Sequence, residues 1–431
     1  MCDTPSPSVA PLRSVAIIGG GLGGLALAQH IRRLHPHLRA TVYERDQSPH
    51  ARRQGYFIGL NANGVSALRP LCESLAPLEQ LLSYEPAMLE SAVILTGALR
   101  KLLWMSVIGK SSMVVSRGAL RHSLLDGIDI QWNKRLRSFT ELDDCVRIEF
   151  EDGTEVEADF LVGADGARSR VRLARWPELS GNTLDLSFCG GSAMLSHAAA
   201  TCPQLSRLTH RSLVVCLGER GHTIVGFGAQ DSLTWTLCWP KECDTERRVR
   251  AIEHGNLEQL HAVALECGRA NFASPEIAAM IAHTQPADMI DTMAAHAMRP
   301  RATNPFGERV TRVTLLGDSL HTMSMHRGLG ANTAFVDAVR LAEALGERDW
   351  RAAIGVYQND AHLRANKALG DSTGSAERMH LQGYKATLRN AMFWMIGWFL
   401  LVAGYWNIVR HTLVSALVAP RHTTVAAKTR D

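Results

Sequence analysis

The residues best suited to chemistry near the N-terminus are three glycines, Gly19, Gly21 and Gly24, in a Gly-x-Gly-x-x-Gly pattern. A β-branched run precedes them and an apolar helical pattern follows. In such a unit the first glycine permits a tight turn, the second lets the backbone approach a pyrophosphate, and the third lets the helix pack on the strand. The phosphates lie at the helix N-terminus, where free N–H groups favour negative charge. The pattern predicts a dinucleotide site.

Glu44 extends this unit. It ends a second strand-like segment, "ATVYERD", 20 residues after Gly24, where a carboxylate would bind ribose hydroxyls. A complete strand, loop, helix, strand and acid is unusual for a glycine turn without a ligand. The fingerprint fits NAD as well as FAD, so other residues must decide between the two.

Two further carboxylates follow apolar strand-like runs. Asp165 lies in "ADFLVGADGARSRVR" and Asp318 in "VTLLGDSLH". The carboxyl ends of parallel strands are where α/β folds bind ligands. An Asp-Gly pair can also be a plain turn, and this alternative stays open for Asp165. Asp318 is followed by a glycine-broken loop and a helix start, which favours a ligand.

Together these three motifs resemble the fingerprints of the single-component FAD-dependent aromatic monooxygenases, the para-hydroxybenzoate hydroxylase-like family, from about Val15 to about Leu345. The resemblance implies an α/β fold, with a Rossmann-like FAD-binding domain, an inserted antiparallel β-sheet substrate domain and C-terminal helices. The expected boundaries are a disordered lead-in over 1–12, the FAD-binding domain over 13–180 and 300–380, the substrate sheet over 181–299, and a hydrophobic helical segment over 381–431.

The resemblance also assigns FAD contacts. Asp318 would hydrogen-bond the ribityl chain, and the backbone after Gly328 would lie against the pyrimidine ring, where a helix N-terminus stabilises reduced flavin. Arg117 would contact the ribityl and phosphate region, Arg45 the adenosine, and the backbone near Gly55 would pass the flavin. The expected cofactor-binding residues are Gly19, Gly21, Gly24, Glu44, Arg45, Gly55, Arg117, Asp165, Asp318, Gly330, Ala331 and Asn332.

The loop after Asp318 departs from the family pattern. Met325 stands where members usually have proline, and Arg327 where many have glycine. Arg327 could meet an acidic substrate or pair at the surface. His321 and His326 lie in the same loop, as core or solvent histidines or as catalytic ones. No catalytic residue is assigned, because the reactive group in this family is mainly the cofactor's.

The implied reaction begins with reduction of the flavin by NADPH or NADH. Molecular oxygen then adds at the flavin C4a carbon, and the hydroperoxide gives one oxygen atom to an aromatic or alkene substrate in a site that excludes water. The expected substrate is a small apolar or aromatic molecule. Alternatives are a flavin-dependent reductase or halogenase of the same fold, although the WxWxIP halogenase motif is absent, or a non-catalytic regulator that binds flavin or another ligand.

Four segments between the second and third motifs, "SFCGGSAML", "RSLVVCLGE", "HTIVGFGAQ" and "LTWTLCWP", have the patterns of antiparallel strands. They would form the substrate sheet. Trp235 and Trp239 are four residues apart, so they share a face of one strand, either as core or as substrate lining.

Composition limits the other possibilities. The 431 residues include 46 basic and 42 acidic side chains, a net charge of +4 that indicates no nucleic-acid partner. Nine cysteines without a CxxC pair or zinc-like spacing predict no metal site and a reducing compartment. The N-terminal residues lack the pattern of a signal peptide, so we expect a protein that is not secreted.

The C-terminal region contains 19 uncharged residues, 391–409, between Arg389 and Arg410. This length suits a membrane span. The same residues could form a soluble helix that packs on the FAD-binding domain. The chain is therefore expected to be cytoplasmic, or associated with a membrane from the cytoplasmic side.

Overall fold

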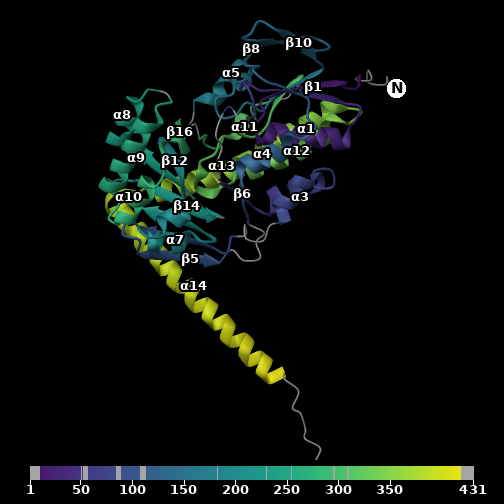
Figure 1. Cartoon of the computed structure of the whole chain (residues 1–431). Helices are drawn as coiled ribbons and strands as arrows, with labels where there is room; N and C mark the ends of the chain where they lie inside the picture. Colours follow the sequence, from purple (N-terminus) through teal and green to yellow (C-terminus); the bar gives the residue numbers. More distant parts are fainter. Residues whose placement is uncertain are drawn as a thin grey trace, which may run out of the picture.

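A computed structural model describes residues 10–49, 51, 57–83, 89–106, 113–181, 183–229, 231–253, 255–294, 297–307 and 310–418. Gly55 lies outside these ranges. Two layered bodies lie side by side, and one long helix projects from them (Figure 1). Of the expected lead-in, residues 10–12 pack on the protein: Leu12 is buried, and Trp350 Nε1 donates to the Ala10 carbonyl at 3.1 Å.

The first body is built on a five-stranded parallel sheet in the order β17-β11-β1-β2-β7. Its strands are β1 (Ser14–Ile18), β2 (Arg39–Tyr43), β7 (Ile130–Gln131), β11 (Phe160–Gly163) and β17 (Val313–Leu315). The central strands are apolar and almost fully buried, as parallel strands covered on both faces must be. Helices α1 (Leu22–Leu34), α12 (Gly330–Leu345) and α13 (Trp350–Met379) pack with this sheet. The expected Rossmann-like domain is confirmed.

Smaller elements complete this body. A three-stranded sheet contains β8 (Leu136–Glu141), β9 (Val146–Phe150) and β10 (Glu155–Ala158), and a two-stranded sheet contains β3 (Phe57–Leu60) and β6 (Met113–Ser116). The connecting helices are α2 (Ala62–Leu68), η1 (Arg69–Leu71), α3 (Ala76–Ser83), α4 (Arg117–Leu125), α5 (Arg170–Arg175) and η3 (Pro177–Ser180).

The second body is a seven-stranded sheet in the order β16-β12-β15-β14-β13-β4-β5. Its strands are β4 (Ser91–Thr96), β5 (Lys101–Ser106), β12 (Leu186–Met194), β13 (Ser212–Leu217), β14 (Thr223–Ala229), β15 (Ser232–Pro240) and β16 (Met289–Ala294). The structure differs here from the expected antiparallel sheet over 181–299. Two strands come from residues 91–106, and β13 pairs with β4 in parallel. Local patterning does not reveal a pairing between segments so far apart in the chain.

Helices cover one face of this sheet: α6 (Leu195–Ala198), α7 (Pro203–Thr209), α8 (Asp244–Arg250), α9 (Leu257–Asn271), α10 (Pro275–Ala282) and η4 (Pro286–Asp288). Trp235 and Trp239 are fully buried beneath them. Their indole N–H groups donate to Thr284 Oγ1 and Glu246 Oε2, each at 2.8 Å. Both tryptophans are therefore core residues rather than substrate lining.

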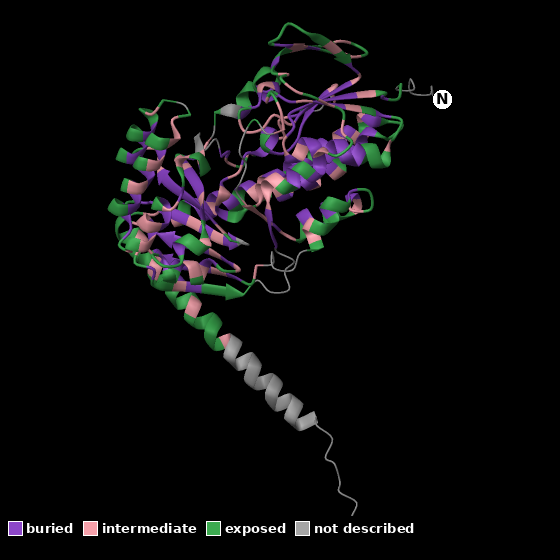
Figure 2. Cartoon of the chain, in the orientation of Figure 1, coloured by how far each residue is buried: buried purple, intermediate pink, exposed green. Residues whose placement is uncertain are grey.

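The last helix, α14 (Gly383–Val418), packs with its base on β5 of the seven-stranded sheet. Arg389 donates to the Met379 carbonyl at the end of α13 (2.6 Å), Phe393 is buried, and a side chain at Gly397 would meet the Leu102 carbonyl at 2.8 Å. The helix then leaves the body, and its described surface is largely exposed (Figures 1 and 2).

The apolar part of α14 is long enough to cross a membrane over Gly383–Ala403, and only 11% of that window is buried. Trp394 and Trp398 are each 52% exposed, and Phe399 is 73% exposed. The described turns of this helix are thus not packed as a core helix of a soluble protein would be.

Candidate functional site

In the glycine loop between β1 and α1, a side chain would fit at one of the three motif glycines and would clash with the backbone at the other two. Gly19 has φ +114°, and a side chain there would meet the Ala164 carbonyl oxygen at 2.4 Å. A side chain at Gly24 would meet the Gly19 oxygen at 2.2 Å, whereas one at Gly21, the N-cap of α1, would meet nothing within 4 Å. Gly19 and Gly24 are therefore required by the fold, whereas Gly21 keeps the N-terminus of α1 open to an anion.

Glu44 at the end of β2 lies against this loop. Its Oε2 accepts from the Gly20 N–H at 2.6 Å and its Oε1 from the Asp46 N–H at 2.9 Å. The residue is only 7% exposed, so the carboxylate is held in one orientation beside the loop. Arg45 is exposed next to it.

Arg121 on α4 is a site residue that the sequence reasoning missed. Its Nε donates to the Gly20 carbonyl at 3.0 Å and its Nη1 to the Pro49 carbonyl at 3.1 Å. The guanidinium therefore fixes the backbone of the glycine loop. The spacing could have revealed it, because Arg121 follows Arg117 by one helical turn and lies on the same side of α4.

Asp165 follows β11 and is more than a plain turn residue. Its Oδ2 accepts from the N–H groups of Arg170 (2.6 Å) and Val171 (3.3 Å), at the start of α5. Its Oδ1 is buried without a hydrogen-bond partner among the described residues. Burial raises the pKa of this carboxyl, and its hydrogen bonds with Ser169 and the backbone oppose that shift. An unsatisfied buried oxygen is suited to accept a hydrogen bond from a ligand.

Asp318 begins the short helix α11 (Asp318–His321) after the turn at Gly317, whose φ is +60°. Burial raises the pKa of Asp318, and the charges of His321, Arg117 and Arg172 oppose this. The carboxyl nevertheless keeps accessible surface. Arg117 and Asp318, predicted from distant segments, thus lie within electrostatic reach of each other.

Arg172 connects the second and third motifs, a role that the sequence did not reveal. Its Nη1 donates to the Ser319 carbonyl at 2.7 Å and to the Asp318 carbonyl at 3.3 Å, while its Nη2 donates to the Ala167 carbonyl at 2.5 Å. One buried side chain therefore sets the position of the Asp318 turn relative to the turn after β11.

His321 belongs to a buried network behind this turn. Its Nε2 lies 2.6 Å from Asp337 Oδ2, which also accepts from the Gly317 N–H at 3.0 Å, and Arg364 Nη2 donates to Asp337 Oδ1 at 3.0 Å. Burial alone would lower the pKa of His321, but the charge and hydrogen bond of Asp337 raise it overall. His321 is therefore a structural residue that joins the turn to α12.

The loop before α12 runs through the 3₁₀ turn η5 (Met325–Arg327) to Gly328, whose φ is +59°. Asn332 braces it: its Nδ2 donates to the carbonyls of Gly59 (2.9 Å) and Gly328 (2.7 Å), and its Oδ1 accepts from the Asn61 N–H at 2.9 Å. This leaves the N-terminal backbone of α12, at Gly330 and Ala331, as a second helix start at the site.

Arg327 and Met325, the two loop residues that depart from the family pattern, lie in different environments. Arg327 is exposed. Met325 reaches the seven-stranded sheet, where its Sδ lies 3.5 Å from Cys238 Sγ. The loop therefore lies between the two bodies, which is where a ligand bound at the α12 N-terminus would meet the sheet.

These groups fit FAD. An open helix N-terminus suits the pyrophosphate and the carboxylate of Glu44 suits ribose hydroxyls. The unsatisfied oxygen of Asp165 and the accessible carboxyl of Asp318 suit the hydroxyls of a ribityl chain. A second helix start, at Gly330, offers a positive end to the pyrimidine edge of the ring.

The profile of the FAD binding domain family matches residues 115–372. The chain is 29% identical to the dual O-methyltransferase/FAD-dependent monooxygenase CTB3 of Cercospora beticola, over 87% of this chain and 47% of that protein. It is 28% identical to the FAD-dependent monooxygenase thnD of Trichoderma harzianum, over 78% of this chain and 83% of that protein. The chain therefore spans about half the length of the dual-function relative.

Solved structures share the fold. HpxO of Klebsiella pneumoniae, complexed with FAD and uric acid, superimposes with a TM-score of 0.71 at 19% identity, over 91% of this chain and 95% of that one. The 2,6-dihydroxypyridine-3-hydroxylase of Arthrobacter nicotinovorans has a TM-score of 0.69 at 19% identity, over 86% and 94% of the two chains.

Proposed function

Because the chain belongs to the FAD binding domain family, we propose that it is an FAD-dependent monooxygenase that transfers one oxygen atom of O₂ to an aromatic or alkene small molecule. NADPH or NADH would reduce the cofactor, and bound FAD would supply the redox and oxygen chemistry. The curated relatives named as FAD-dependent monooxygenases support this activity. The observation that supports it most directly is the position of the loop before α12 against one face of the seven-stranded sheet.

Strand alternation identifies which face this is. On β15, Trp235 and Leu237 point into the core under α9 and α10, so Thr234, Thr236 and Cys238 point to the opposite face. Cys238 contacts Met325 of the loop before α12. The face that carries Thr234 and Thr236 is therefore the face toward the cofactor site.

The pairing of residues across strands then shows which side chains lie together on this face. We call Ser192, Phe227 and Thr234 the substrate floor. Thr234 pairs directly with Ser192 on β12 and with Phe227 on β14. The hydroxyls of Ser192 and Thr234 lie 3.1 Å apart, and Phe227 is partly exposed beside them. A row of one aromatic ring and two hydroxyls suits a flat apolar molecule that carries a hydroxyl or carbonyl group.

Two relatives in fold support this substrate class. One was crystallised with uric acid, and the other is named for hydroxylation of a dihydroxypyridine. Both compounds named are flat heterocycles with polar substituents. By analogy, we assign Phe227 to pack against the substrate ring, and Ser192 and Thr234 to orient its polar group.

The test is to reduce the purified protein with NADPH or NADH, and to follow flavin bleaching and oxygen uptake with and without candidate aromatics. A substrate should stimulate oxygen uptake and yield a product that contains one atom of labelled O₂. Reduction without any oxygenated product would favour the reductase alternative. A halide-dependent product would favour the halogenase, and absence of reduction would favour a regulator.

Matched variants test the floor. Thr234→Val and Phe227→Ala should raise the KM for a confirmed substrate and divert reduced flavin to hydrogen peroxide, since the substrate would be held less firmly. Ser212→Ala is the control, because its hydroxyl pairs with Ser91 at 2.6 Å on the opposite face of the same sheet. Equal effects of the three substitutions would contradict the assignment of this face.

We also propose that α14 inserts into a membrane from the cytoplasmic side. The exposed apolar surface beyond Phe393, with Phe399 at 73% and Leu401 at 65% exposure, supports this. Exposed Met105 on β5, on the face of that strand that packs on α14, would extend the apolar surface toward the lipid. An apolar substrate could then reach the enzyme from the bilayer.

A further inference from the structure

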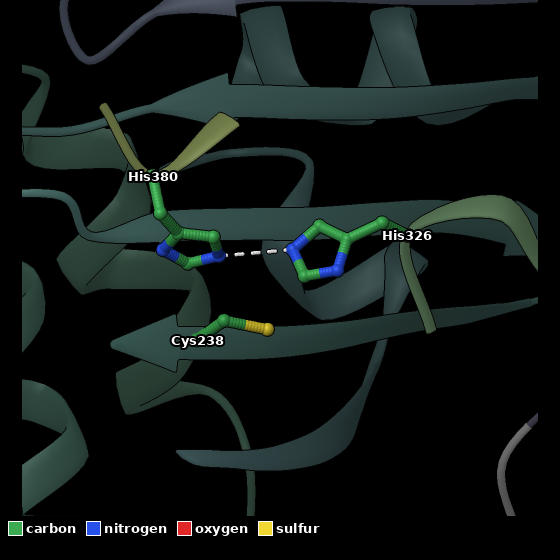
Figure 3. A group of neighbouring side chains, drawn as sticks. All are labelled: Cys238, His326 and His380. Atoms are coloured by element: carbon green, nitrogen blue, oxygen red, sulfur yellow. Dashed lines mark hydrogen bonds between the residues drawn. The ribbon is translucent and has the colours of Figure 1, made fainter. Parts of the chain in front are cut away.

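Three side chains that no functional role has absorbed meet in the interior between the two bodies. Cys238 lies on β15, His326 in η5, and His380 at the end of α13. All three are buried, and their ligand atoms lie within 4.8 Å of one another. Figure 3 shows the two imidazole rings facing each other across a hydrogen bond, with the thiol beside them.

The two histidines present nitrogen atoms to each other. His326 Nε2 lies 2.9 Å from His380 Nε2, and His380 Nδ1 lies 2.5 Å from the Gly221 carbonyl. Because a carbonyl can only accept, the proton of His380 is on Nδ1 and its Nε2 carries a lone pair. A histidine held this way by a backbone carbonyl has the arrangement that metal-ligating histidines commonly have.

Burial disfavours the charged form of both rings. Burial lowers the pKa of His326 to about 3, with a contribution from His380, and lowers that of His380 to about 4. His326 Nδ1 is also buried with no hydrogen-bond partner among the described residues. The His326 ring is therefore incompletely satisfied, which is costly in a protein interior.

Sulfur atoms complete the cluster. Cys238 Sγ lies 3.5 Å from the thioether of Met325. Burial raises the pKa of the Cys238 thiol to about 12, so without a cation beside it the thiol stays protonated. A cavity of about 10 Å³ adjoins Cys238, Ser324, Met325 and His326, which is room for about one water molecule.

We propose that Cys238, His326 and His380 bind a thiophilic metal ion, zinc or copper(I). Thiolate and imidazole are the ligands that both ions prefer, and the Met325 thioether or a water molecule can fill the fourth position. Binding would release the thiol proton of Cys238 to solvent, and the proton of His326 would move from Nε2, which donates to His380 in the metal-free pair, to Nδ1. A thiolate and two neutral imidazoles would then ligate the ion. No electron transfer is required.

Binding an ion requires the three donor atoms, which lie within 4.8 Å of one another, to move to the distances of a coordination shell. With metal–nitrogen bonds of about 2.05 Å and a metal–sulfur bond of about 2.3 Å, ligand atoms around a tetrahedral ion lie roughly 3.3 to 3.6 Å apart. The nitrogens must separate slightly from their 2.9 Å contact. The sequence predicted no metal site because the three donors come from distant segments and have no local spacing.

An ion here would join three parts of the molecule. Cys238 belongs to the seven-stranded sheet, His326 to the loop before α12, and His380 to the junction between α13 and α14. The ion would therefore fix the loop before α12 against the seven-stranded sheet and the start of α14.

The test begins with the metal content of the full-length, FAD-loaded protein by mass spectrometry, as purified and after titration with zinc or copper(I). We expect close to one ion per chain, and a cobalt(II) difference spectrum with a thiolate-to-metal charge-transfer band. Cys238→Ala should abolish both. Cys189→Ala is the matched control, since this buried thiol lies on the neighbouring strand but faces the opposite core.

The two metals are distinguished by which one co-purifies and which binds more tightly, and either one supports the site. The proposal is overturned if the wild-type protein binds no more metal than Cys238→Ala, or if cobalt gives no thiolate band. The cluster would then be a hydrogen-bonded pair of histidines only. The cobalt measurement uses the wild-type chain, so it decides the question even if Cys238→Ala fails to fold.

Discussion

Asp318, in the turn after β17, and Asp337, on α12, have different roles: the first faces the cofactor site and the second supports the fold. Asp337 is fully buried and accepts hydrogen bonds from Gly317, His321 and Arg364, so it is committed to the fold. Asp318 keeps accessible surface on the cofactor side. We therefore expect substitutions of these two carboxylates to separate stability from cofactor binding.

The first prediction concerns Asp318→Ala. Loss of a hydrogen-bond acceptor for the ribityl chain should weaken FAD binding by about 1 to 3 kcal/mol, with little change in the free energy of unfolding of the apoprotein. Titration of apoprotein with FAD measures the affinity. Asp371→Ala, which removes an exposed carboxylate from α13, is the control. An Asp318→Ala protein with unchanged FAD affinity would show that the turn does not serve the cofactor.

The second prediction concerns Asp337→Asn. Removing the charge opposite buried His321 should cost about 3 to 5 kcal/mol of unfolding free energy, because it leaves the buried histidine without its ionic partner, whereas partly exposed Arg364 keeps Asp360. Chemical denaturation measures this loss. A loss below 1 kcal/mol would mean that the network is not a main support of the Asp318 turn.

The third prediction follows from the raised pKa of His321. A pKa that is higher in the folded state than in the unfolded state means that protonation stabilises the fold. This stabilisation is fully present below pH 6.5, the ordinary value, and is lost as pH rises through the folded pKa. The difference in unfolding free energy between wild type and His321→Gln should therefore shrink above pH 6.5. His122→Gln, at an exposed site on α4, is the control for the loss of a histidine outside this network.

Sequence reasoning proposed site residues whose role depends on a local strand, turn and helix. Glu44 and Asp165 follow strands, and their surroundings fit the predicted ligand site. It missed Arg172 and Asp337, because their partners lie far along the chain and no local pattern marks them. Their contribution depends on the packing of distant segments, which a single sequence does not reveal.

At the level of elements, the glycine loop gives the fourth prediction. Gly24→Ala should destabilise the fold by about 1 to 3 kcal/mol, because the added carbon would overlap the Gly19 carbonyl oxygen. Gly21→Ala should leave stability nearly unchanged but weaken FAD binding, since its carbon would point into open space at the start of α1. Thermal unfolding of the apoproteins and FAD titration separate the two effects. Equal loss of stability in both variants would contradict this division.

Elements with strong local patterns were predicted with their correct type. The Rossmann unit follows from its β-branched strand, glycine turn and helix, and the strands of the second body follow from their alternation. The membership of β4 and β5 in the second sheet was not predicted, because their pairing with β13 joins residues near 91 to residues near 212. Sheet order is a property of long-range pairing.

For the whole molecule, the fifth prediction concerns α14. Full-length protein should sediment with membranes and resist a salt wash, whereas a chain that ends after Ile396 should be soluble and still bind FAD. The truncated chain keeps Arg389 and Phe393, which hold the base of the helix.

A single charge introduced into α14 should also reduce membrane association. Phe399→Lys should weaken membrane association, because a charge within the bilayer costs about 2.5 to 3.5 kcal/mol. Leu363→Lys, at an exposed apolar site on α13, should leave it unchanged. Full-length protein that is monodisperse without detergent would contradict membrane insertion.

The position of β17 at one edge of the parallel sheet has a consequence for synthesis on the ribosome. β1, β2, β7 and β11 are complete by Gly163, but β17 emerges only after the whole second body, at Val313–Leu315. The Asp318 turn and α12 emerge later still. A nascent chain therefore cannot form the complete cofactor site until β17 and the start of α12 have been made, and β11 waits meanwhile with an unpaired edge. At about 5 to 20 residues per second, this wait lasts roughly 8 to 30 seconds, during which free FAD offers the chain little protection from aggregation.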